Sequence, residues 1–241
     1  MNKMAFAGLV VSAGMIGMTA MAEMLVKAEP SSQAVKPEAV RPTEKIALFN
    51  GKSFDGWTKV IKAETNACPD KTWKIEDGII KCSGTPFGYL RTQQSYADYK
   101  LHVEYRWADT TTKSPNSGIF VFTTGPDNFF LPKAIEAQLK MGSAGDWVML
   151  STATLNGLEN KGTKSVKRQA TEGSEKPRGE WNSVDVTVKG KTVEVSVNGV
   201  LMNKGVDVYT DAGQICLQSE GGAIDFRVVT IEPIEKKADA K

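Results

Sequence analysis

The residues best suited to chemistry lie on the polar faces of four predicted β-strands. Alternate side chains of a strand share one face, and an ordinary solvated face carries mostly Lys, Thr, Ser and Glu. Carboxylate and amide groups exchange hydrogen bonds with neighbouring hydroxyls, and arginine donates in a fixed fork. If the strands are neighbours, we expect one polar groove that binds carbohydrate. The polar positions are His102, Glu104 and Arg106; Glu136, Gln138 and Lys140; Gln214, Cys216 and Gln218; and Asp225 with Arg227.

A second interpretation of these polar faces stays equally open. The same side chains can form a buried network of ion pairs and amides whose only role is to set the strand register. In the groove interpretation, the side chains of Trp107 and Trp147 offer stacking surfaces at the rim.

The composition excludes several other chemistries. The chain has 1 histidine, so a cluster of histidines around a metal is excluded and a Ser-His-Asp triad would need His102. No G-x-S-x-G or C-x-x-C motif is present. The 30 Lys and Arg residues nearly balance the 28 Asp and Glu residues and are scattered, so we predict no nucleic-acid partner. No motif requires a cofactor, although carboxylate and carbonyl oxygens could hold a divalent cation.

Short alternating segments separated by turns predict an all-β domain. Asp77-Gly78 and Asn198-Gly199 are dipeptides that tight β-hairpins prefer. No stretch of helical length has an apolar period of 3.6 residues. Many strands, regular turns and no βαβ alternation predict an antiparallel sandwich or jelly roll. The expected strands include residues 73–75, 79–82, 101–106, 119–122, 135–140, 184–188, 193–197, 213–219 and 223–231.

The N-terminus has the pattern of an export signal. Lys3 precedes an uncharged apolar stretch at residues 5–20, and A-M-A at residues 20–22 is a small-x-small cleavage pattern. We predict a signal peptide over residues 1–22 and a periplasmic or secreted protein with no membrane span after cleavage. A membrane anchor is the alternative, which the short, glycine-containing stretch disfavours.

The remaining chain divides into three predicted parts. Residues 23–44 are rich in Pro, Ala, Ser and Lys and predict a disordered tether. Residues 45–236 form the sandwich domain, and residues 237–241 form a charged tail. In an exported chain Cys68 and Cys82 could close a short disulfide loop, a pairing that the sequence leaves open.

A series of short motifs, taken in order, resembles a known family. Residues 48–57 read L-F-N-G-K-S-F-D-G-W, which is similar to the opening signature of the 3-keto-disaccharide hydrolase domain family (DUF1080). The resemblance covers about residues 46–235. One departure is Val228 after F-R, where the family usually continues with Asn-Ile. The further motifs are W-K-I-E-D-G at 73–78, E-Y-R at 104–106, N-S-G-I at 116–119, I-E-A-Q at 135–138, G-S-A-G-D at 142–146, G-E-W-N at 179–182, V-N-G at 197–199 and D-F-R at 225–227.

The resemblance implies both a fold and an activity. The fold is a concanavalin A-like, laminin-G-like jelly roll, in agreement with the strand pattern. The implied substrates are glycosides oxidised to a ketone at carbon 3, cleaved by elimination, by hydration, or by both with net hydrolysis. Because the same fold also serves pure binding, a non-catalytic carbohydrate-binding module is the alternative, and a structural interaction domain is the third.

A mechanism for such a substrate needs a base and hydrogen-bond donors. The ketone acidifies the hydrogen on carbon 2, so one base can remove it while donors stabilise the enolate. On this hypothesis Glu136 is the base, or Glu104 if the geometry reverses them, and His102 protonates the leaving oxygen. Ordinary double displacement needs two carboxylates, and the E-x-Q-x-K strand has only one. The expected substrate-binding residues are Arg106, Asn116, Gln138, Lys140 and Gln218.

Overall fold

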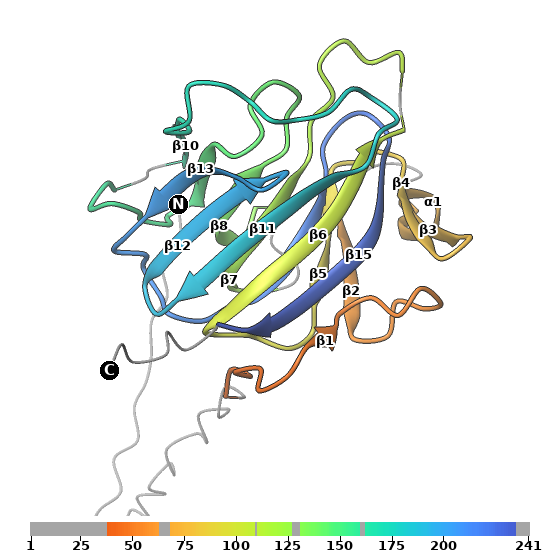
Figure 1. Cartoon of the computed structure of the whole chain (residues 1–241). Helices are drawn as coiled ribbons and strands as arrows, with labels where there is room; N and C mark the ends of the chain where they lie inside the picture. The colour runs from red at the N-terminus through yellow and green to blue at the C-terminus, as the bar shows by residue number, and fades with distance from the viewer. Residues whose placement is uncertain (1–37, 63–67, 109, 127–130, 160–161, 235–241) are drawn as a thin grey trace, which may run out of the picture. The chain divides into compact units, whose positions relative to one another are not determined.

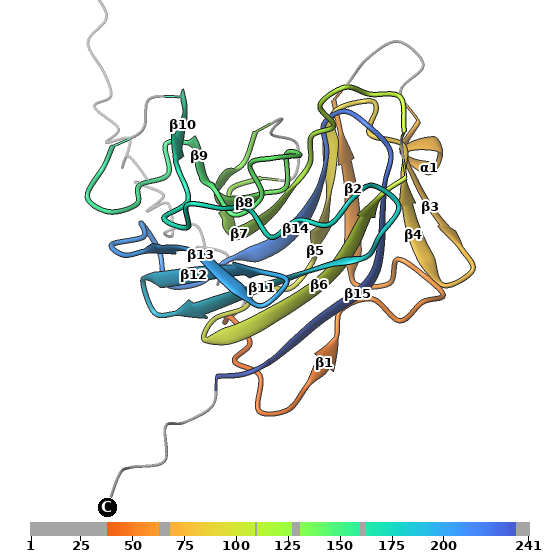
Figure 2. The ribbon, with the colours of Figure 1, turned by 45° about the horizontal axis from the view of Figure 1, so that its top comes forward.

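Two antiparallel β-sheets pack face to face over one apolar core (Figure 1). The view in Figure 2, turned by 45°, shows the two sheets as separate layers. We call the eight-stranded sheet the β6 sheet and the seven-stranded sheet the β8 sheet, after a central strand of each. The computed structural model describes residues 38–62, 68–108, 110–126, 131–159 and 162–234.

The β6 sheet and the β8 sheet are each built from strands that are distant in the sequence. The order in the β6 sheet is β13 (Val200–Gly205), β12 (Thr192–Val197), β11 (Asn182–Lys189), β6 (Tyr99–Trp107), β15 (Ile224–Pro233), β4 (Ile79–Cys82) and β3 (Trp73–Glu76), with β1 (Ile46–Ala47) paired to β15. The order in the β8 sheet is β10 (Gly162–Val166), β9 (Trp147–Ser151), β8 (Lys133–Gln138), β7 (Gly118–Thr124), β14 (Gln214–Ser219), β5 (Gly88–Thr92) and β2 (Trp57–Ile61).

The all-β antiparallel sandwich predicted from the sequence is confirmed. Asp77 and Gly78 have φ of 52° and 74°, and Asn198 and Gly199 have φ of 49° and 80°, as a hairpin turn with two left-handed residues requires. The β3–β4 and β12–β13 hairpins follow from these turns. The described residues contain one short helix, α1 (Pro69–Thr72), which the sequence pattern did not predict.

Strands of the β8 sheet are buried on both faces, which explains why several were not identified from alternation. All five residues of β5 and the first four of β9 are buried. The inner face of this sheet packs in the main core, and its outer face carries a second apolar cluster. The members of the second cluster are Tyr89, Phe120, Ala134, Val148, Leu150 and Cys216.

The two tryptophans expected at the rim of a groove are core residues instead. Trp107 is 1% exposed and Trp147 is 0% exposed, and both belong to the cluster between the sheets. A large aromatic side chain buries more apolar area between two sheets than at the rim of a groove. Burial in the core is therefore more favourable for these two tryptophans than exposure for stacking on a sugar.

The folded domain begins before residue 45, where the tether was expected to end. Val40 forms a parallel bridge with Tyr96, and Arg41 Nε lies 3.0 Å from Asp98 Oδ2. Residues 38–44 therefore belong to the domain. The predicted signal peptide at residues 1–22 and the tail at 237–241 lie outside the described residues.

Two further expectations concern the cysteines and the membrane. Cys68 and Cys82 do not form a disulfide bond. Burial raises the pKa of the Cys82 thiol to about 11, so this thiol stays protonated and unreactive at neutral pH. Within the described part of the chain, no helix is long and apolar enough to cross a membrane.

Candidate functional site

The outer face of the β8 sheet carries a hollow of about 180 Å³ at the end of strand β8. Glu136 on β8 lies between Phe120 of β7 and Val148 of β9 in the strand register. Gln138, two residues further on, points to the same face because side chains alternate along a strand. The hollow is lined by Phe87, Leu131, Glu136, Gln138, Val148, Leu150, Ser165, Gln218 and Glu220.

Glu136 is a buried carboxyl group in a largely apolar setting. Its side chain is 2% exposed, and Oε1 has no hydrogen-bond partner. Burial, with a smaller contribution from the charge of Glu220, raises the pKa of Glu136 well above its ordinary value. Burial in this position favours the protonated form of the carboxyl group. It can therefore donate a proton or a hydrogen bond to a ligand.

Gly118 on β7 makes room for this carboxyl group. Gly118 lies opposite Gln138 in the register, and a Cβ atom added at Gly118 would overlap Oε1 of Glu136. The glycine of the N-S-G-I motif is therefore required by the Glu136 side chain. This role explains why a glycine begins a strand whose other residues are β-formers.

Glu220 is a second carboxylate of the hollow, and we did not identify it from the sequence. It follows β14 directly and is half-buried. Burial raises the pKa of Glu220, while a hydrogen bond from Gln218 and the charge of Lys140 lower it. The signal was available, because Gln214, Cys216 and Gln218 alternate onto one face and the next position of that series is residue 220.

Of the expected binding residues around β8 and β14, Gln138 and Gln218 line this hollow, whereas Lys140 and Asn116 do not. Oε1 of Gln138 accepts a 2.9 Å hydrogen bond from the backbone N–H of Lys140, which fixes the amide plane. Oε1 of Gln218 is buried and has no partner. The backbone N–H of Asn116 donates to Gly221 O at 2.6 Å, and its side-chain Oδ1 is buried without a partner.

The residues expected on β6 lie elsewhere, so the prediction of a single polar groove is wrong. His102, Glu104 and Arg106 belong to the β6 sheet, whereas β8 and β14 belong to the other sheet. Their partners come from the neighbouring strands of the β6 sheet. His102 Nδ1 lies 2.9 Å from Asp185 Oδ1, and Arg106 Nε lies 2.9 Å from Asp225 Oδ2.

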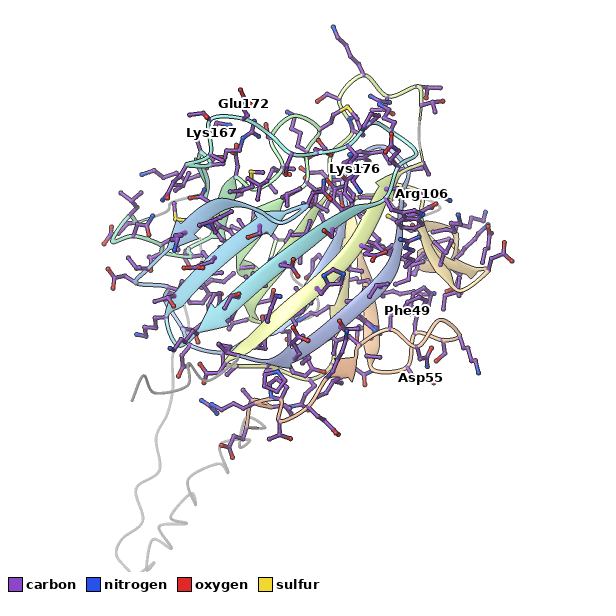
Figure 3. The ribbon with its side chains drawn as sticks, in the orientation of Figure 1. Phe49, Asp55, Arg106, Lys167, Glu172 and Lys176 are labelled. Atoms are coloured by element: carbon purple, nitrogen blue, oxygen red, sulfur yellow. The ribbon has the colours of Figure 1, made fainter. Side chains whose placement is uncertain are left out.

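This outer face of the β6 sheet is a paired network. Glu104 accepts a hydrogen bond from Arg227, and Lys81 Nζ lies 2.9 Å from Asp225 Oδ2. The guanidinium carbons of Arg106 and Arg227 lie 4.7 and 4.3 Å from the ring centroid of Trp181. Figure 3 labels Arg106 on this sheet. These contacts match the register-setting network that was the alternative interpretation.

A divalent cation has no cluster of usual ligands in the described residues. No three His, Cys, Asp or Glu side chains gather there closely enough to hold a metal ion. The carboxyl groups of Glu136 and Glu220 with the amide oxygen of Gln218 supply oxygen atoms that a hard cation accepts. Cation binding at this site stays a prediction.

The fold and the hollow define a concanavalin A-like jelly roll with an acidic site on the outer face of one sheet. The family model of the 3-keto-alpha-glucoside-1,2-lyase-like domain matches residues 44–232. The chain therefore belongs to this family, and it is a carbohydrate-active domain. No curated protein sequence matches the chain.

Solved structures with the same fold include proteins that cleave or bind carbohydrate. A proposed glycosyl hydrolase from Parabacteroides distasonis is 20% identical, with a TM-score of 0.58 over 80% of this chain and 94% of that chain. The β-glucanase of Bacillus licheniformis is 14% identical, with a TM-score of 0.52 over 78% and 97%. The carbohydrate-binding module CBM66 of Bacillus subtilis is 12% identical, with a TM-score of 0.52 over 73% and 95%. At these identities the likeness shows the fold alone.

Proposed function

We propose that the chain cleaves 3-keto glycosides by elimination in the hollow of the β8 sheet, with Glu220 as base and Glu136 as acid. The observation that carries this proposal is the pair itself. Two carboxyl groups line one small hollow, and Glu136 is the more deeply buried of the two. Neighbouring titratable groups whose environments separate their pKa values are suited to opposite proton-transfer roles.

The environments support this division of roles. Glu136 is almost fully buried, which raises its pKa and favours its protonated form, so it can give a proton. Glu220 is half-buried, and Lys140 and Gln218 lower its pKa against the effect of burial, so it can lose its proton first. The base role given to Glu136 on sequence grounds therefore moves to Glu220 in this proposal.

The elimination needs one proton removed and one delivered. The carboxylate of Glu220 takes the hydrogen on carbon 2, which the neighbouring ketone acidifies. The bond between carbon 1 and the glycosidic oxygen breaks, carbon 1 and carbon 2 become doubly bonded, and Glu136 gives its proton to the departing oxygen. Glu220 is then protonated and Glu136 is ionised.

The reverse roles return both groups to their starting forms. A water molecule gives a proton to Glu136 as its oxygen adds to carbon 1. Half-buried Glu220, whose proton has exchanged with solvent, delivers a proton to carbon 2. The sum of the two steps is net hydrolysis to a 3-keto sugar. Oxygens of Glu220 and Gln218 could hold a divalent cation, which would supply Lewis-acid stabilisation of the enolate.

The walls of the hollow suit one sugar ring, the one whose glycosidic bond is cleaved. Phe87 and Leu131 are half-buried apolar side chains, which suit the apolar face of a pyranose ring. Gln138 and Gln218 place amide groups beside it, and the unpartnered Oε1 of Gln218 can accept from a sugar hydroxyl. A hollow of about 180 Å³ suits a terminal residue, with the leaving group outside.

The test follows hydrogen at carbon 2. The purified protein is incubated in deuterated water with a 3-keto aryl glucoside, with and without divalent ions, and the products are followed by mass and NMR. We expect aglycone release with deuterium at carbon 2 of the keto sugar, because Glu220 removes that hydrogen. Aglycone release with the original hydrogen retained at carbon 2 would indicate direct hydrolysis and contradict the elimination.

A non-catalytic carbohydrate-binding module is the second candidate. The observation that favours it is the burial of Glu136, whose side chain is only 2% exposed. This candidate predicts affinity for unoxidised glycans and no bond cleavage. Titration with maltose and cellobiose, beside the turnover assay, separates the two functions.

Export is a further part of the proposal and is supported by residues 1–22. We expect the protein in the periplasm or the medium, where glycans are encountered. Fractionation of cells that express the full chain, with N-terminal sequencing of the product, tests both the location and cleavage before Glu23.

A further inference from the structure

A second, basic cleft lies outside this site, between the loop after β8 and the loop that joins β10 to β11. It consists of two hollows of about 540 and 380 Å³, which share Gly142 and Arg168. Figure 3 labels Lys167, Glu172 and Lys176 along the β10–β11 loop. The charged side chains that line the cleft are the cations Lys167, Arg168, Lys176 and Arg178 and the carboxylates Asp146 and Glu175.

Both oxygens of the Glu175 carboxylate accept hydrogen bonds from groups of the protein itself. Its Oε1 accepts from Tyr105 Oη and Trp107 Nε1, both at 2.9 Å, and its Oε2 accepts from the backbone N–H of Gly142 at 3.1 Å. These bonds attach the β10–β11 loop to the β6 sheet and to the loop after β8. Glu175 therefore holds the shape of the cleft.

Asp146 has the same positioning role on the other side. It is 3% exposed, and it accepts from Lys167 Nζ at 2.8 Å and from the backbone N–H of Arg168 at 2.9 Å. A buried carboxylate with two donors fixes the local backbone firmly. The start of the β10–β11 loop, where Arg168 lies, is thereby held in one place.

Two cations of the cleft are held by neutral acceptors. Arg168 Nη1 donates to Gly142 O at 2.9 Å, and Lys176 Nζ donates to Trp181 O at 2.9 Å. A carbonyl oxygen fixes a cation without neutralising it, so the cleft keeps an excess of positive charge. Arg168 also has further N–H donors beyond the one that Gly142 receives.

We propose that this cleft binds the anionic group of an acidic glycan, a uronate carboxylate or a sulfate ester. The planar guanidinium of Arg168 matches either group in two-point contact, and Lys176 adds a compact charge beside it. These cations are confined to one cleft and do not extend over a face as the basic patch or stripe typical of nucleic-acid binding does. This inference does not rest on the proposed elimination, because it concerns binding at a different place.

Titration of the full chain with oligogalacturonate, with sulfated dextran and with neutral dextran tests the proposal. We expect one or both acidic polymers to bind and neutral dextran not to bind, and which acidic polymer binds distinguishes carboxylate from sulfate. The Arg168→Gln/Lys176→Gln double variant should weaken binding about tenfold or more, since charge-assisted hydrogen bonds are lost. Glu136→Gln should leave this binding unchanged.

The matched control is Lys74→Gln/Lys189→Gln, which removes the same two charges from exposed positions of the β6 sheet. It should bind as the unaltered chain does. Lys176→Gln alone, with its melting temperature measured, guards against misfolding of the double variant. No binding of either acidic polymer, equal binding by the cleft and control variants, or equally tight binding of single-stranded DNA would overturn the proposal.

Discussion

The outer faces of the two sheets carry similar polar side chains but differ in how those side chains are paired. On the β6 sheet, Asp225 lies 2.9 Å from Nε of Arg106, and Asp185 lies 2.9 Å from Nδ1 of His102. On the β8 sheet, Oε1 of Glu136 and Oε1 of Gln218 are buried and have no partner. Glu220 lies close enough to Glu136 to raise its pKa further.

This difference distinguishes a structural surface from a functional one. A buried polar atom left without a partner costs about 1–3 kcal/mol, and native proteins contain few of them. Two such atoms in one hollow, on Glu136 and Gln218 with Glu220 beside them, are therefore best explained by a ligand that completes the hydrogen bonds. On the outer face of the β6 sheet the charged groups of the network are paired with one another, and the unpartnered buried atom described there is the Thr230 hydroxyl, opposite His102.

The largest expected effect is on turnover. Glu220→Gln should lower kcat for a 3-keto aryl glucoside about a thousandfold, because a general base contributes roughly 10²–10⁴. Glu104→Gln, the matched change on the β6 sheet, should leave kcat within about twofold, since that residue contacts only its own network. The rate of aglycone release at saturating substrate gives kcat for both variants. An equal fall in kcat would contradict the assignment of catalysis to the β8 sheet alone.

The next effect concerns the space that Gly118 provides. Gly118→Ala should lower kcat by about 10–100-fold, because the new Cβ displaces the Glu136 carboxyl group and small misplacements are costly. Gly205→Ala, on β13 of the β6 sheet, is the matched control, since its added Cβ would meet the core side chains of Leu155 and Val193 and not Glu136. Steady-state kinetics measures kcat of the two variants. An unaltered kcat in Gly118→Ala would exclude Glu136 from the reaction.

A change in the paired network should affect stability and spare activity. Asp225→Asn removes the shared partner of Lys81 and Arg106, and Asp225 is 2% exposed. We expect a loss of about 1–3 kcal/mol in the free energy of unfolding, from two cations that lose a charged partner. Urea denaturation measures it. A large fall in kcat at unchanged stability would instead place Asp225 in a functional site.

The buried Glu136 should destabilise the protein as the pH rises. Its pKa is raised in the folded state, so its stabilising contribution is complete below its ordinary pKa of 4.5 and is lost as the pH rises towards the folded value. Glu136→Gln removes this titration, so its melting temperature should exceed that of the unaltered chain by more at pH 8 than at pH 4. An equal difference at both pH values would show that the carboxyl group is not desolvated.

The smallest effect belongs to His102. Hydrogen bonding to Asp185, opposed by burial, raises its pKa, so its contribution is present below about pH 6.5 and is lost as the pH rises through the folded value. We expect about 0.2–1 kcal/mol, as for a partly exposed pair. Asp185→Asn should flatten this part of the stability curve between pH 6 and 9 without changing turnover. NMR titration of the His102 ring provides the pKa directly.

The fold could be predicted from local patterns, but the site could be predicted only in part. Alternation and the Asp77-Gly78 turn identify strands and hairpins because both depend on neighbours in the sequence. Which sheet a strand joins depends on distant partners, so Glu104 and Glu136 were wrongly placed in one groove. Glu220 was missed because it follows its strand, and Trp147 was misplaced because alternation does not say which face is the core.

The central claim is that carbohydrate is processed on the β8 sheet and not on the β6 sheet. The most direct test is a crystal structure of the Glu220→Gln variant with a bound 3-keto glycoside. The account predicts the sugar between Phe87 and Leu131, with carbon 2 facing residue 220 and the glycosidic oxygen near Glu136. A sugar bound on the outer face of the β6 sheet, beside Trp181, would contradict it.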